Sequence, residues 1–167
     1  ELGAGVGAPG LLAAAAGCAE VVLSDVSEES LRVLRGNVKR FEDSTSPERH
    51  PLLRAARLDF FSAAEVGALA ATSQFDLVLS ADCAYESGAA ASLVTAIDAL
   101  LAPGGTAFVA DRNRPIGGPK VVVQLTSEAE RLGFSLEWLD PVQHFEDGLA
   151  ATGLPGDLVT GCVDGHS

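Results

Sequence analysis

The sequence has few cysteines, no long hydrophobic run and fewer basic than acidic residues. Its three cysteines are widely spaced along 167 residues, which argues against a disulfide framework and is typical of reduced thiols in a cytosolic protein. No apolar stretch is long enough to cross a membrane, because Gly17 and Glu20 interrupt the longest one. The net charge of -12 disfavours a nucleic-acid partner, which would require a basic face.

The remaining composition is that of an ordinary folded domain. Hydrophobic residues make up 47% of the chain, so disorder is not expected, and the length suits one domain over residues 1–167. The three histidines are too scattered to indicate a metal site. We therefore expect a protein of the cytoplasm, or alternatively of the nucleus. We also expect a monomer that binds neither a metal nor a membrane.

The first ten residues carry the strongest local pattern. Gly3, Gly5 and Gly7 alternate with small residues and allow a sharp turn and close approach of a ligand to the backbone. Pro9 suits the first turn of a helix, which the apolar run after it can continue. A glycine turn that leads into a helix N-terminus can bind an anionic group. A dinucleotide loop, or a glycine turn without a ligand, fits the same spacing.

A strand over residues 20–25 follows and ends in Asp25. Asp25 lies about twenty residues after the glycine turn, where doubly wound folds place the carboxylate that binds ribose hydroxyls. The alternative is that Asp25 only begins a turn or caps the next helix. That helix is predicted over residues 27–40, with Leu31, Leu34 and Val38 on its buried face.

Strand and helix patterns then alternate to the end of the chain, which predicts a doubly wound, Rossmann-like α/β fold. Further strands are expected at 55–61, 75–81, 106–110, 134–140 and 157–163, and further helices at 88–102 and 120–132. The charged cluster 111–115, which includes Asp111, Arg112 and Arg114, follows a strand at the edge where such sheets bind ligands. For any single residue of that cluster, a solvated loop is favoured over a ligand contact.

Two motifs together resemble a known family. Residues 1–7, Glu-Leu-Gly-Ala-Gly-Val-Gly, resemble motif I of the class I S-adenosylmethionine (SAM) methyltransferases, whose acidic residue lies two places before the first glycine. Residues 75–85, Phe-Asp-Leu-Val-Leu-Ser-Ala-Asp-Cys-Ala-Tyr, resemble the strand-four signature of the family-16 type protein methyltransferases, many of which methylate lysine. The resemblance covers most of residues 1–112.

The resemblance implies SAM as the cofactor and a set of residues around it. Gly3, Gly5 and Gly7 would meet the methionine end of SAM, with Glu1 close to its ammonium group, and Ala81 would also contact the cofactor. Asp59 and Phe60 occupy the place where the family reads adenine, although Phe60 stands where tryptophan is frequent. The alternative for Asp59 and Phe60 is a strand end followed by core phenylalanines.

The resemblance also implies the site of transfer, the sheet order and the role. Asp82 and Tyr85 would lie beside the methyl-transfer channel; the alternative is that Asp82 caps the following helix and Tyr85 packs on it. The implied strand order is 3-2-1-4-5-7-6 with strand 7 antiparallel, and most of strand 1 would precede Glu1.

We expect methyl transfer to a nitrogen, most favourably a protein lysine. A small-molecule methyltransferase and a non-catalytic SAM-binding module remain open. A nicotinamide dehydrogenase is disfavoured by Glu1.

Overall fold

The structure, a computed structural model, describes residues 1–46, 51–112, 115 and 120–139. Contacts divide the chain into two units, Glu1–Phe134 and Ser135–Ser167. All helices and strands named below lie in the first unit, which is described here by itself. The expectation of one domain over residues 1–167 stays a prediction.

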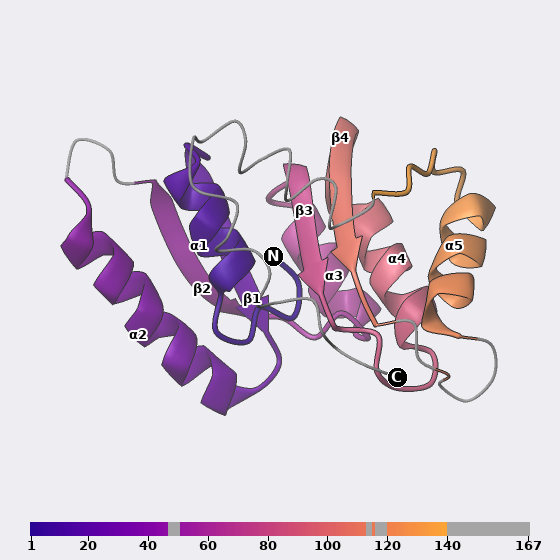
Figure 1. The fold of residues 1–167 in the computed structure, drawn as a ribbon, viewed down its shortest axis with the longest axis horizontal. Coiled ribbons are helices and arrows are strands. Elements are labelled where there is room, and N and C mark those ends of the chain that lie inside the picture. Colours follow the sequence, from indigo (N-terminus) through magenta and orange to yellow (C-terminus); the bar gives the residue numbers. More distant parts are fainter. Residues whose placement is uncertain (47–50, 113–114, 116–119, 140–167) are drawn as a thin grey trace, which may run out of the picture. The chain divides into compact units, whose positions relative to one another are not determined.

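The sheet consists of two parallel pairs joined by the start of the chain. Strand β1 (Glu20–Asp25) pairs with β2 (Leu52–Arg57), and β3 (Phe75–Ala81) pairs with β4 (Leu101–Ala110). Leu2 forms parallel bridges with Ser24 of β1 on one side and Ser80 of β3 on the other. The order across the described sheet is therefore β2, β1, residue 2, β3 and β4 (Figure 1).

Backbone hydrogen bonds fix the first four residues between β1 and β3. The nitrogen of Leu2 donates to the carbonyl of Leu79 at 2.8 Å, and the nitrogen of Ala4 donates to the carbonyl of Ser24 at 2.8 Å. The register places Leu2 level with the penultimate residues of β1 and β3. The glycine turn therefore begins at the same edge at which β1 and β3 end, which is the ligand-binding edge of open α/β sheets.

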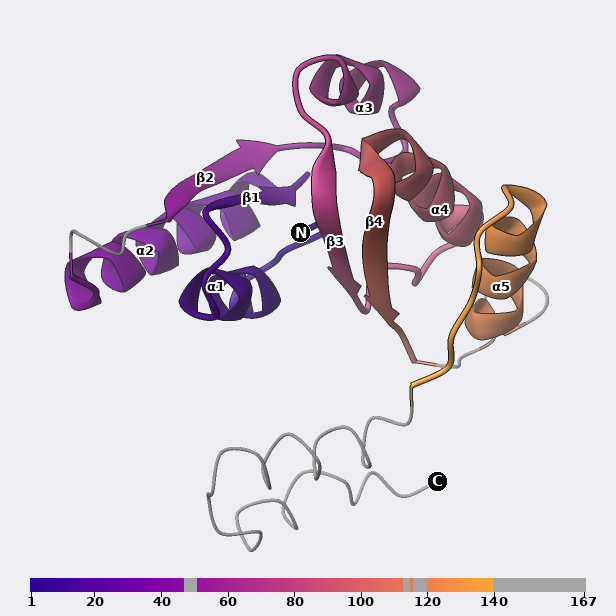
Figure 2. The same ribbon diagram turned by 90° about the horizontal axis from the view of Figure 1, so that it is seen from above.

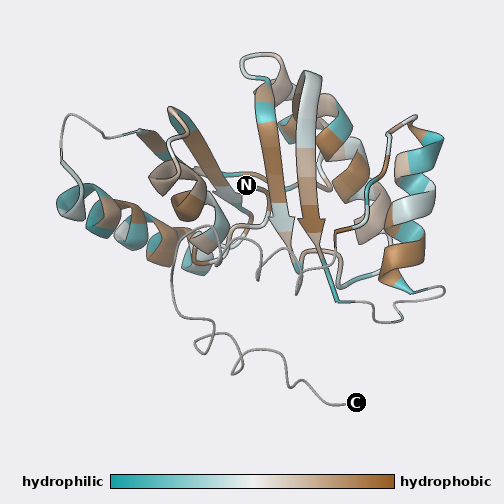
Figure 3. Cartoon of the chain, turned by 45° about the horizontal axis from the view of Figure 1, so that its top comes forward, coloured by the Kyte–Doolittle hydropathy of each residue, from teal (hydrophilic) through white to brown (hydrophobic). Residues whose placement is uncertain are grey.

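Helices cover both faces of this sheet. Helices α1 (Ala8–Ala15) and α2 (Glu28–Ser44) pack beside β1 and β2, whereas α3 (Ala63–Ala70), α4 (Ala89–Leu100) and α5 (Val121–Arg131) lie on the other side (Figure 2). Hydrophobic and hydrophilic residues recur along α2, and the middle of β3 and the carboxyl-terminal end of β4 are hydrophobic (Figure 3). This pattern agrees with an amphipathic helix on a central parallel sheet.

Two larger hydrophobic clusters, one on each side of the sheet, and a smaller one of Ala84, Ala89 and Val121 form the core. The α1 and α2 side contains the buried residues Ala4, Ala14, Val21, Leu23, Leu31, Leu34 and Val38. The α3 and α4 side contains Leu2, Leu58, Val66, Val78, Cys83, Leu93, Ala96, Ile97 and Leu100. Buried apolar residues on both sides are typical of a sheet covered by helices on both faces.

Most of the predicted elements are present, with four differences. Strand β4 begins at Leu101, directly after α4, so residues 101–105, which the sequence placed in the end of the helix and before the strand, lie in the strand. Strand β2 ends at Arg57, so Asp59 and Phe60 lie in the turn after it and not in a strand. Helix α3 was not predicted from the sequence. The strand predicted over 134–140 is wrong for residues 134–139, which have no regular secondary structure; Leu136 and Trp138 are exposed, so an apolar alternation did not create a strand without a partner. Residues 157–163 lie outside the described residues.

Candidate active site

The glycine turn adopts the backbone conformation that its sequence predicts. Gly3, Gly5 and Gly7 have φ values of 61°, 53° and 81°, a region that L-residues rarely occupy. A Cβ atom on Gly3 would lie 2.4 Å from the Sγ atom of Cys83, but one on Gly5 would meet no atom within 4 Å. Gly3 is therefore required by packing, whereas Gly5 borders the open space that a ligand could fill.

Glu1 lies against the beginning of α1. Its Oε2 atom accepts a hydrogen bond of 2.9 Å from the backbone nitrogen of Gly10, in the first turn of that helix. Burial raises the pKa of the Glu1 carboxyl above its ordinary value, although the Gly10 hydrogen bond opposes this. A carboxylate placed beside a helix N-terminus at the sheet edge can hold a cation. The predicted contact of Glu1 with an ammonium group stays a prediction.

Asp25 and the glycine turn meet directly. The two carboxylate oxygens of Asp25 accept hydrogen bonds from the backbone nitrogens of Gly5, at 2.9 Å, and Ser27, at 2.8 Å. The hydrogen bond from Gly5 links the end of β1 to the glycine turn. The hydrogen bond from Ser27 forms the turn that the sequence analysis gave as the alternative role of Asp25. Each carboxylate oxygen has a further lone pair, so Asp25 can also accept from a ligand hydroxyl.

Asp59 and Phe60 follow β2 in a turn that the start of α3 stabilises. Glu65 of α3 accepts a hydrogen bond of 3.0 Å from the backbone nitrogen of Asp59 and forms an ion pair with Arg57 at 2.7 Å. The rings of Phe60 and Phe61 are stacked with centroids 4.9 Å apart. Phe60 also packs on the core cluster around Leu58, so this ring has the core contacts that the sequence allowed as an alternative.

The residues 82–85 form a constrained turn directly after β3. Asp82 has a φ of 54°, and among the described residues it is the one non-glycine with positive φ. For an L-residue this conformation costs about 1–2 kcal/mol, although Asp tolerates it better than most. Helix α4 begins at Ala89 with Gly88 as its N-cap and no side-chain cap, so Asp82 does not cap that helix. The Tyr85 side chain does not pack into the core, because this residue is 63% exposed.

Cys83 joins this turn to the glycine turn. Its buried Sγ atom lies 3.3 Å from the carbonyl oxygen of Leu2 and 3.6 Å from that of Gly3. Burial raises the pKa of the Cys83 thiol, so the thiol stays protonated and can donate to these carbonyls. The two predicted motifs, far apart in the sequence, are therefore in contact.

The end of β4 supplies residues that the sequence did not assign to the site. The backbone nitrogen of Ala84 donates to the carboxylate of Asp111 at 2.8 Å, and the Nε atom of Arg112 lies 3.6 Å from the carboxylate of Asp82. The only sequence signal for these two residues is their place after a strand at the ligand-binding edge. Arg114 lies outside the described residues.

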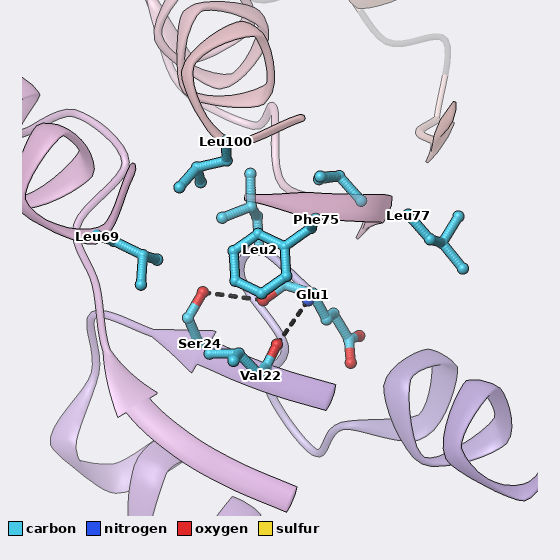
Figure 4. Close-up of a pocket in the computed structure, with 9 residues that line it drawn as sticks. Glu1, Leu2, Val22, Ser24, Leu69, Phe75, Leu77 and Leu100 are labelled. Carbon is cyan, nitrogen blue, oxygen red and sulfur yellow. Dashed lines mark hydrogen bonds between the residues drawn. The ribbon is translucent and has the colours of Figure 1, made fainter. Parts of the chain in front are cut away.

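A small cavity of about 20 Å³ lies beside Glu1 and Leu2 (Figure 4). Its other walls are mostly apolar side chains of β1, α3, β3 and α4, including Val22, Leu69, Phe75 and Leu100. This volume is near that needed for one water molecule. The cavity is therefore too small for a cofactor.

Comparisons with known proteins agree with these motifs. A sequence model of a family described as lysine methyltransferase matches residues 1–127. The chain belongs to this family. The resemblance predicted from residues 1–7 and 75–85 is thereby confirmed.

Two known proteins are similar to this chain, one in sequence and one in fold. The chain is 30% identical over 122 residues to the protein N-terminal and lysine N-methyltransferase EFM7 of Yarrowia lipolytica, a match that covers 65% of this chain and 45% of that protein. The crystal structure of the glycopeptide N-methyltransferase MtfA is similar in fold, with a TM-score of 0.50 and 17% identity, over 65% of this chain and 43% of that one. The chain thus spans less than half the length of either relative.

Two searches of the described residues were negative. No group of three or more His, Cys, Asp or Glu residues in that part of the chain could hold a metal ion. Among the helices described there, none is long and apolar enough to cross a membrane.

Proposed function

We propose that this chain transfers a methyl group from SAM to a nitrogen of a protein, most favourably the side-chain amine of lysine. The observation that carries the proposal is the contact between the two motifs: Cys83 lies 3.3 Å from the carbonyl of Leu2, so the Asp82–Tyr85 turn adjoins the glycine turn. A cofactor on the glycine turn would thus be next to Asp82 and Tyr85. Membership of the lysine methyltransferase family supports the same reaction.

The geometry fits the groups of SAM. The open space beside Gly5 and the Asp25 carboxylate that accepts from Gly5 suit the approach of a ribose and its hydroxyls. Glu1 would attract the ammonium group of the methionine part, with Gly3 and Gly7 shaping the turn. When bound, SAM supplies an electrophilic methyl group on a sulfonium.

The other end of the cofactor would meet the turn after β2. Asp59 would accept from the exocyclic amine of adenine, and Phe60 would lie near the adenine ring. Glu65 holds the backbone of this turn through its hydrogen bond with Asp59. Ala81, the last residue of β3 and exposed at the sheet edge, would contact the cofactor between the two turns.

Carboxylates at the sheet edge favour a cationic acceptor. Asp25 ends β1, Asp59 lies two residues after β2, and Asp82 and Asp111 directly follow β3 and β4. If Asp25 and Asp59 bind the cofactor, Asp82 and Asp111 are the carboxylates nearest the acceptor, because they lie in and beside the Asp82–Tyr85 turn. Arg112, whose Nε atom lies 3.6 Å from the Asp82 carboxylate, offsets part of this negative charge. The remaining negative charge, on a chain of net charge -12, attracts a lysine ammonium and disfavours a phosphate backbone.

The chain's own residues would mainly orient the acceptor and release its proton. A lysine amine has an ordinary pKa of about 10.4 and must lose a proton before it can attack. Asp82 would hold the ammonium, and the Tyr85 hydroxyl would align the neutral amine for in-line attack. The ammonium would first pass a proton to Asp82 or water. The new N–CH₃ bond would then form as the S–CH₃ bond breaks, with the electron pair of that bond left on sulfur.

Isotopic labelling tests this proposal. The protein is incubated with methyl-labelled SAM and a cell extract, and label is sought in protein bands and in the small-molecule fraction. Label on lysine of a protein band is expected. At a SAM concentration that does not saturate the variant, Asp25→Ala should reduce it, while Asp98→Ala, at an exposed position of α4, should not. Label on N-terminal amines alone, on small molecules alone, or nowhere would contradict the lysine assignment.

The strand order, the localisation and the oligomeric state belong to the same proposal. We propose the strand order 3-2-1-4-5-7-6 with strand 7 antiparallel, in which β2, β1, residue 2, β3 and β4 take the first five places. We further propose a cytoplasmic monomer that acts on a protein substrate. A crystal structure of the protein would test the strand order, and size-exclusion chromatography would test the oligomeric state.

A further inference from the structure

The turn that carries Asp82 and Tyr85 is held from one side by the end of β4. The backbone nitrogen of Asp82 donates to the carbonyl of Ala110 at 2.7 Å. Two residues later, the backbone nitrogen of Ala84 donates to the Asp111 carboxylate at 2.8 Å. These two hydrogen bonds, from consecutive residues of β4 and its extension, flank Cys83 and fix the peptide groups on both sides of it.

The Ala84 contact satisfies a buried backbone group. Ala84 is 0% exposed, and a buried backbone N–H without an acceptor is strongly disfavoured. Asp111 thus anchors the chain two residues after Asp82, which has a left-handed φ of 54°. Unfavourable backbone conformations of this kind persist where surrounding contacts determine them and concentrate at functional sites.

We propose that Asp111 is a positioning residue of the methyl-transfer site. It acts through Ala84 on the geometry of the Asp82–Tyr85 turn, and it contacts neither the cofactor nor the acceptor. The inference rests on the proposed function, since the turn is taken to orient the acceptor amine. A residue with this role influences the transfer step much more than cofactor binding, which depends on the glycine turn and Asp25.

Kinetics separate this role from a general structural one. In Asp111→Ala the single-turnover rate at saturating SAM should fall about tenfold or more, while the affinity for S-adenosylhomocysteine changes less than about twofold. Asp111→Asn retains an amide oxygen that can accept from Ala84, so it should recover most of the rate. Asp98→Ala provides the matched control on α4.

A second readout needs no activity. Tyr85 is the single tyrosine of the chain, so incorporation of 3-fluorotyrosine gives one ¹⁹F resonance from the turn itself. Asp111→Ala should shift or broaden that resonance, whereas Asp111→Asn and Asp98→Ala should leave it in place. If Asp111→Ala does not fold, Asp111→Glu keeps the charge but lengthens the side chain, and it should both move the resonance and slow transfer.

The outcomes distinguish this proposal from the proposed function. An unmoved resonance and a wild-type rate in Asp111→Ala, or in Asp111→Glu if that variant is used, would overturn the positioning role. Equal losses of rate and of cofactor affinity would also overturn it. A moved resonance in Asp111→Ala together with a wild-type rate in Tyr85→Phe would support the effect of Asp111 on the turn but contradict the assigned function of that turn.

Discussion

Replacing Gly3 by alanine tests whether the glycine turn and the Asp82–Tyr85 turn are in contact. Gly3 and Gly5 have nearly the same backbone conformation, with φ values of 61° and 53°. Their surroundings differ, because a Cβ on Gly3 would lie 2.4 Å from the Sγ atom of Cys83 whereas a Cβ on Gly5 would meet nothing within 4 Å. Gly5→Ala is therefore a matched control for the backbone effect alone.

The expected losses of stability follow from two costs, the backbone conformation and the packing of the added methyl group. A positive φ at a non-glycine residue costs about 1–2 kcal/mol, and forcing an extra methyl group into a packed site costs about 1–3 kcal/mol. Gly5→Ala should thus lower the free energy of unfolding by about 1–2 kcal/mol, from the backbone term alone. Gly3→Ala should lower it by about 2–5 kcal/mol, the sum of both terms.

Removing the Cys83 sulfur should rescue the packing part of this loss. Without Sγ, the nearest remaining atom to a Cβ on Gly3 is the Cβ of Cys83 at 3.5 Å, an ordinary contact distance. In a Cys83→Ala background, Gly3→Ala should therefore cost only about 1–2 kcal/mol, a coupling of about 1–3 kcal/mol. Urea unfolding of the four proteins at constant m-value measures this coupling. Equal costs of Gly3→Ala and Gly5→Ala, or zero coupling, would refute the contact.

Two further predictions concern the carboxylates at the glycine turn. Asp25→Ala removes a charge-assisted hydrogen-bond acceptor worth about 1.5–3 kcal/mol, so calorimetry should show a loss of roughly ten- to a hundredfold in affinity for S-adenosylhomocysteine; unchanged affinity would remove Asp25 from the site. Burial raises the pKa of Glu1 above 4.5, so the folded chain binds that proton more tightly than the unfolded chain, and the free energy of unfolding should fall as pH rises from 4.5 through the folded-state pKa. Glu1→Gln should lack this decrease, and parallel pH profiles for wild type and variant would contradict the burial effect.

The sequence predicted the elements whose patterns are local and strong. The spacing of Gly3, Gly5 and Gly7 and the apolar run 75–81 predict a turn and a strand by backbone preference and hydrophobicity alone, and both are present. The strand is less buried than predicted, because Val78 and Ser80 are its buried residues. Helix α3 was missed because its Ala- and Gly-rich sequence has little apolar periodicity. Its one signal is Ser62 three residues before Glu65, where the Ser62 hydroxyl accepts a hydrogen bond from the Glu65 nitrogen at 3.3 Å.

The sequence predicted part of the candidate site. Asp25 could be placed beside the glycine turn because the doubly wound topology brings the ends of neighbouring strands together. The support that Asp111 gives to Ala84 joins residues 27 positions apart, and it depends on the register of β3 and β4, which no local pattern specifies. The alternation of Phe134, Leu136 and Trp138 misled the prediction of a strand, because strand formation depends on a partner that the pattern does not contain.

The most direct test of the account is single-turnover methyl transfer by Tyr85→Phe and Asp82→Asn. Both variants are compared with wild type at saturating SAM, with a lysine substrate identified by the labelling experiment and with S-adenosylhomocysteine affinity measured in parallel. If these side chains orient the acceptor amine, each variant should slow transfer by roughly tenfold or more with little change in cofactor affinity. Wild-type rates in both variants would contradict the assignment of methyl transfer to this turn.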